Sequence, residues 1–76
     1  MISTRRPVMN EDTLNMEIRQ FLKKVGISSQ REIEQAIYAA LDTQQLNGDE
    51  TLPIKITLTM PDLDLHHHVS GQIKLV

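Results

Sequence analysis

The apolar residues of this 76-residue chain change their spacing partway along, and this change limits the fold more than any other feature. Up to residue 41 they recur every three or four positions, which is typical of one face of an α-helix. From residue 52 they alternate with other residues, which is typical of a half-buried β-strand. Helical segments followed by strands predict an α+β domain.

The first group of apolar positions predicts a helix that ends near Val25. Its members are Leu14, Ile18, Phe21, Leu22 and Val25. Asn10 or Asp12 can cap the beginning of this helix. Gly26 stands where a left-handed residue often ends a helix, and Leu22 and Ile27 would form the hydrophobic pair of that ending.

A second helix is predicted to begin at once, because Ser29 and Glu32 have the spacing of a capping box. Its apolar stripe consists of Ile33, Ala36, Ile37, Ala40 and Leu41. The polar segment of residues 42–50 ends the helical part and is long enough to act as a hinge.

The alternating second half predicts a β-hairpin that turns at Pro61-Asp62. With this turn, Met60 is opposite Leu63 and Leu52 is opposite Gly71, and the apolar residues of both strands share one face. Residues 72–76 then have no partner strand within the chain. The unpaired segment is an apolar edge that something must cover.

The short chain and its unpaired strand end predict a homodimer. A chain of this size buries only about 60% of its unfolded surface, and it contains no cysteine for a disulfide. Two hairpins side by side would form a four-stranded antiparallel sheet with two helices from each copy on one face. The predicted interface comprises Ile54, Ile56, Leu58, Val69, Ile73 and Leu75. Exchange of hairpins and pairing of edges both stay open, and a small monomer is the alternative.

Residues 9–76 resemble a family of short bacterial proteins of unknown function. The segments that carry the resemblance are Met9–Asp12, Asn15–Lys23, Val25–Glu34, Leu58–Thr59 and Gly71–Ile73. Residues 1–9 show no periodicity and contain Pro7, which predicts a flexible arm before a single domain of residues 10–76. Whether Met1 or Met9 is the natural start stays open. The resemblance implies no activity, cofactor or catalytic residue.

A candidate metal site consists of Asp64, His66 and His68, which are two residues apart and therefore share the polar face of a strand. Zinc uses such ligands in sets of three or four, and two copies could complete one set. His67 belongs to the apolar face. The simpler interpretation is that the histidines are solvated side chains of an exposed strand.

A second candidate site is a nucleic-acid surface. Two helices joined by a turn at Gly26 and followed by a hairpin resemble a winged helix-turn-helix, and the bases that could contact phosphates are Arg19, Lys23, Lys24 and Arg31. A net charge of −2 and the missing third helix oppose this interpretation.

No enzymatic motif, cofactor-binding motif or small-molecule pocket is indicated by the sequence. The longest apolar run is too short for a membrane span, and Pro7 and polar residues stand where a signal peptide needs apolar ones, so a cytoplasmic location is expected. The predicted function is that of a small non-catalytic interaction or scaffold protein. Its partner is a second copy or an unidentified protein.

Overall fold

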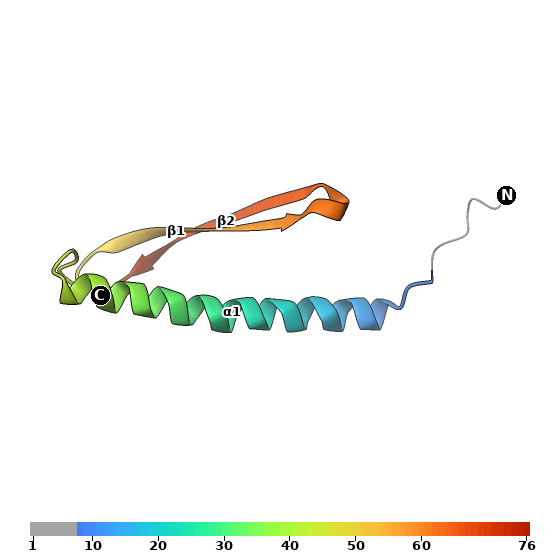
Figure 1. Ribbon diagram of the computed structural model, residues 1–76, viewed down its shortest axis with the longest axis horizontal. Coiled ribbons are helices and arrows are strands. Elements are labelled where there is room, and N and C mark those ends of the chain that lie inside the picture. Colours follow the sequence, from blue (N-terminus) through green and yellow to red (C-terminus); the bar gives the residue numbers. More distant parts are fainter. Residues whose placement is uncertain (1–7) are drawn as a thin grey trace. The chain divides into compact units, whose positions relative to one another are not determined.

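The computed structural model describes residues 8–76, which form one long helix followed by one β-hairpin (Figure 1). Helix α1 spans Glu11–Asp42, strand β1 spans Thr51–Met60 and strand β2 spans Leu65–Lys74, with a short 3₁₀ turn, Pro61–Leu63, between the strands. The general α+β class is confirmed. The predicted pair of helices and the four-stranded sheet are wrong, because the structure has one helix and a two-stranded sheet. Most of the predicted arm, residues 1–9, lies outside the described residues.

Asn10 is the N-cap of α1. Its side-chain Oδ1 accepts a hydrogen bond from the Thr13 backbone N–H at 3.1 Å, and its carbonyl accepts one from the Leu14 N–H at 2.9 Å. Glu11 and Asp12 in the first turn place negative charge at the positive end of the helix dipole. Of the two predicted caps, the structure uses Asn10.

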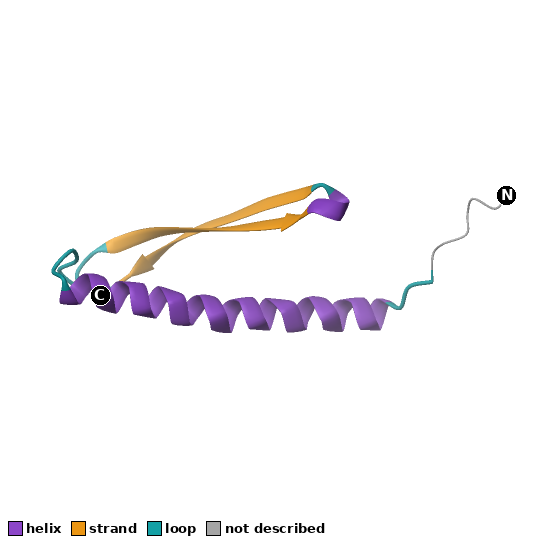
Figure 2. Cartoon of the chain, in the orientation of Figure 1, coloured by secondary structure: helices purple, strands orange, loops and turns teal. Residues whose placement is uncertain are grey.

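Gly26 lies inside α1 and does not end it. Figure 2 shows α1 as one uninterrupted helix. The two predicted stripes are one stripe, because Leu14, Val25 and Ala36 are spaced by eleven residues, as are Ile18, Ser29 and Ala40. Eleven residues fill three helical turns almost completely, so the stripe stays on one side of a continuous helix. A glycine inside a helix costs about 1 kcal/mol. Two new helix ends would instead leave backbone groups without partners.

The helix ending that the sequence predicts at Gly26 forms at Gln44 instead. Gln44 adopts a left-handed backbone with φ of 64°. Its N–H donates to the Leu41 carbonyl at 3.1 Å, and the Gln45 N–H donates to the Ala40 carbonyl at 2.8 Å. These two bonds are those of a Schellman motif. The helical part therefore ends where the polar segment of residues 42–50 was predicted to end it.

Glu50 closes the loop between α1 and β1. Its carboxylate accepts hydrogen bonds from the backbone N–H groups of Asn47 at 2.8 Å and Gly48 at 2.9 Å. These bonds lower the pKa of Glu50 below its ordinary value, because they stabilise the ionised form. The Glu50 carbonyl also accepts from the Leu75 N–H at 3.1 Å, which joins the two ends of the hairpin.

The strands pair with a register two residues away from the predicted one. Met60 is opposite Leu65, Leu58 is opposite His67 and Leu52 is opposite Ile73. The predicted two-residue turn is wrong because the chain needs four residues, Pro61 to Asp64, and Asp64 closes the turn with a left-handed φ of 51°. A shift of two residues keeps every side chain on its predicted face.

This register leaves almost none of β2 without a partner. Lys74 pairs with Thr51, and Leu75 follows with its bond to Glu50. The prediction that residues 72–76 have no partner strand is therefore wrong. The unpaired strand end is one of the two reasons for expecting a second copy. Only the other reason, the small size of the chain, is left.

None of residues 8–76 is buried. The half-buried apolar side chains in α1 are Val25, Ile33, Ile37, Ala40 and Leu41, and those in the hairpin are Leu52, Ile54, Leu58, Ile73 and Leu75. Fifteen large apolar side chains are exposed, Phe21 at 57% and Val69 at 56% among them. A single copy of the described chain therefore has apolar faces but no hydrophobic core.

Substitution of Gly26 by alanine is expected to stabilise the protein by up to about 1 kcal/mol, because alanine favours a helix interior. A Cβ atom at this position meets nothing within 4 Å. Gly48→Ala is the contrasting variant: its φ of 107° is strained for any other residue, so a loss of about 1–2 kcal/mol is expected. Urea unfolding followed by circular dichroism at one protein concentration measures both. A destabilised Gly26→Ala would restore the two-helix interpretation.

Candidate functional site

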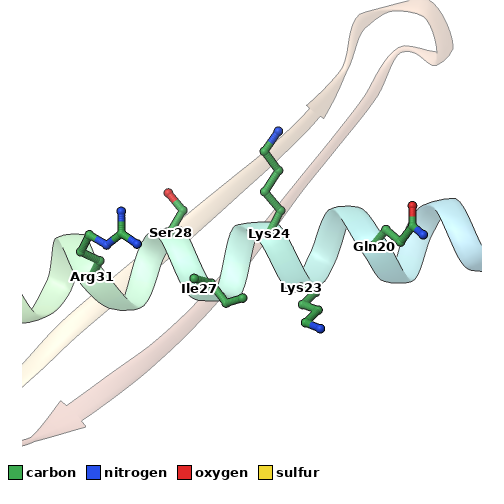
Figure 3. Close-up of a pocket in the computed structure, with 6 residues that line it drawn as sticks. All are labelled: Gln20, Lys23, Lys24, Ile27, Ser28 and Arg31. Atoms are coloured by element: carbon green, nitrogen blue, oxygen red, sulfur yellow. The ribbon is translucent and has the colours of Figure 1, made fainter.

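The middle of α1 carries a basic groove, which we define by its lining residues Gln20, Lys23, Lys24, Ile27, Ser28 and Arg31. Residues 19–31 contain four bases and no acid. Three of these bases line the groove, which has a volume of about 400 Å³ and is open to solvent. Figure 3 shows Lys24 and Ser28 at one edge of the helix and Lys23 at the opposite edge, with Ile27 between these edges.

Helical spacing brings the groove residues together. Gln20, Lys24, Ile27 and Arg31 follow each other at three or four positions, so they occupy one side of the helix. Gln20, Ile27 and Arg31 lie on the side away from the apolar stripe, and Lys24 lies between them and the stripe. Ile27 is 55% exposed and gives the groove an apolar floor between cations.

Of the four bases predicted to contact nucleic acid, the structure brings together Lys23, Lys24 and Arg31, and Arg19 does not line the groove. The helix-turn-helix that was predicted to carry them is wrong, because Gly26 and Ser29 lie within one continuous helix. The bases therefore form a linear surface on a single helix. Sequence reasoning missed Gln20, Ile27 and Ser28, which the spacing relative to Lys24 could have found.

The histidines of β2 lie as the alternation predicts, His66 and His68 opposite Thr59 and Thr57 on the polar face. The His66 Nε2 is 3.5 Å from the Asp64 Oδ1, and both side chains are well exposed. The His68 Nδ1 lies 3.0 Å from the Thr57 hydroxyl. The Thr57 partner was missed because it depends on the register.

Asp64, His66 and His68 do not converge on one point in a single copy. Among residues 8–76, no group of three or more histidine, aspartate or glutamate side chains is placed to hold a metal ion. Asp64 reaches His66, whereas His68 is occupied by Thr57 across the hairpin. A complete ligand set would require a second copy.

Titration of the protein with Zn²⁺ in a calorimeter is expected to show no site tighter than the millimolar range, because two exposed histidines are an incomplete set of zinc ligands. His68→Ala should then give the same titration curve as the parent protein. A micromolar site that is lost in His68→Ala would instead establish a shared metal centre at this end of the hairpin.

Comparison with known protein families identifies the family of the chain. The model of a family of unknown function, DUF6494, matches residues 9–76. The chain belongs to this family. The resemblance found in the sequence is thereby confirmed, with the same boundary after residue 8. No curated protein and no solved structure matches the chain at a significant level.

Helix α1 is not suited to cross a membrane. Its residues are too polar on one side to form an apolar span of the necessary length, and no other helix within residues 8–76 meets that requirement.

Proposed function

We propose that this member of the DUF6494 family is a non-catalytic interaction protein whose stable form is a homodimer. The observation that carries the proposal is the absence of any buried residue among residues 8–76. A two-stranded hairpin alone is marginally stable in water, and helices in proteins depend on packing of their apolar side. The helix and the hairpin therefore both need another apolar surface to cover their apolar sides.

The length of α1 supports the proposal that another molecule covers the apolar stripe at the beginning of this helix. The 32 residues of α1 span about 48 Å, whereas each ten-residue strand spans about 33 Å. The hairpin begins near the end of α1, where Gln45 and Ala40 tie the loop to the helix. Each strand is therefore shorter than α1, so the hairpin can cover only part of the length of the helix at one time.

A second copy fits this need because each copy brings the same apolar surfaces. In an isologous pair the same surface of both copies forms the interface, so both copies bury the same apolar residues. The residues proposed for the interface on the hairpin are Ile54, Ile56, Leu58, Val69, Ile73 and Leu75. In the observed register all six lie on one face of the sheet.

The variant Val69→Asp tests the proposed hairpin interface. Val69 is 56% exposed in one copy, so a charge there costs little in a monomer but places an unpaired charge in an apolar interface. Light scattering should give twice the chain mass of 8.7 kDa for the parent protein and the single mass for the variant at the same micromolar concentration.

Ser70→Asp is the matched control, because Ser70 is the next residue on β2 and lies on the polar face opposite Lys55. It should keep the mass of the parent. A parent protein that is monomeric at millimolar concentration would contradict the proposal, as would equal masses for the two aspartate variants.

Nucleic acid is a second candidate partner, favoured by the three cations that line the basic groove. Phosphate contacts by lysine and arginine supply most non-specific affinity for nucleic acids. The double variant Lys24→Glu/Arg31→Glu is expected to abolish a gel shift of mixed DNA and RNA at low salt, and Lys55→Glu on the hairpin is its control. Absence of any shift with micromolar parent protein would remove this candidate.

A further inference from the structure

We infer that two copies pair through the first half of α1, with the two helices antiparallel and centred near residue 20. The inference rests on the proposed self-association and names its geometry. Two observations carry it: the exposed bulky segment of the helix and the order of the charges along the same segment.

The exposed bulky side chains of the apolar stripe lie before Gly26. Leu14, Ile18, Phe21 and Leu22 are each exposed by 44–57%, and Val25 is half-buried. Beyond Gly26 the bulky side chains of the stripe, which are Ile33, Ile37 and Leu41, are half-buried. The bulky segment is thus the part of the helix that most needs a partner.

An antiparallel arrangement about residue 20 aligns this segment with itself. Leu14 then lies opposite Val25 of the second copy, Ile18 lies opposite Leu22, and Phe21 lies near the two-fold axis. Side chains at spacings of three and four residues interlock along such a seam. Every bulky residue gains an apolar neighbour.

The charges in this part of α1 are ordered by sign. Before Gly26 the acids Glu11, Asp12 and Glu17 come first, and the bases Arg19, Lys23 and Lys24 follow. An antiparallel pair brings Glu17 to the level of Lys24 of the second copy. Arg19 alone approaches its own counterpart. A parallel pair would bring acids beside acids and bases beside bases, which is unfavourable.

Glu17 and Lys24 also lie on the correct side of the stripe. Glu17 is three residues after Leu14 and Lys24 is three residues after Phe21, so both border the apolar residues on the same side, two turns apart. In an antiparallel pair equivalent sides face each other. Each Glu17 therefore reaches Lys24 of the second copy, and the contact occurs twice. The opposed helix dipoles favour the same orientation.

Charge reversal tests the orientation. Glu17→Lys or Lys24→Glu alone should raise the dimer dissociation constant about tenfold at low salt, because each variant turns both attractive pairs into repulsive ones. The double variant Glu17→Lys/Lys24→Glu should return to within about threefold of the parent. Salt at 1 M should remove most of the difference.

The control is Lys55→Glu, a reversal on the polar face of β1, which should leave the dissociation constant unchanged. In a parallel pair each charge faces its own copy, so single reversals would have no effect. That result would overturn the inference. So would a double variant as weak as the single ones.

Cross-linking gives an independent test, because the chain has no cysteine of its own. In the antiparallel pair the two copies of residue 14 are about 16 Å apart along the axis, too far for a disulfide, as are the two copies of residue 25. Oxidation of Leu14→Cys alone or Val25→Cys alone should give no covalent dimer. A mixture of the two variants should give one.

The two proposals fail in different ways. A parent protein that is monomeric by light scattering would remove the homodimer itself. A dimeric parent whose Leu14→Cys variant cross-links with itself, and not with Val25→Cys, would keep the homodimer and overturn only the antiparallel orientation.

Discussion

The helix and the two strands of residues 8–76 leave every apolar face partly exposed, and the proposed association follows from this constraint. In the described part of the chain no side chain is buried, although the apolar residues are arranged in regular faces on α1 and on the hairpin. Each apolar face would form one side of a hydrophobic core if a second apolar surface covered it. Because the hydrophobic effect rewards removal of these faces from water, the self-association proposed above would stabilise the folded state, and the stability of the protein would then depend on its concentration.

The continuity of α1 depends on the eleven-residue spacing of its apolar stripe. Leu14, Val25 and Ala36 mark the repeat, and Gly26 lies beside it at a modest energetic cost. The same continuity decides the functional surfaces. It places Lys23, Lys24 and Arg31 on a single helix, where a helix-turn-helix would have divided them between two helices.

Some features of the predicted sites are found in the structure and others are not, because some depend on local sequence and others on contacts between distant residues. His66 and His68 share a face in the structure, since alternation along a strand is a local property. Their partners are not local: Thr57 reaches His68 only because the hairpin turn takes four residues, Pro61 to Asp64. Arg19 does not line the groove with the other three predicted bases.

The sequence by itself determined the α+β class, a helix cap at Asn10 or Asp12, the polar segment between helix and hairpin, and which residues share each face. These features depend on periodicity and on side chains that bond to nearby backbone. Only the tertiary structure decided that Gly26 stays helical, that the Schellman ending forms at Gln44, and that β2 is paired up to Lys74. A glycine is compatible with both a helix interior and a helix end, and a shift of two residues preserves the faces of a strand. The local sequence pattern is therefore compatible with both alternatives. The free energy of the complete set of backbone hydrogen bonds selects one of them.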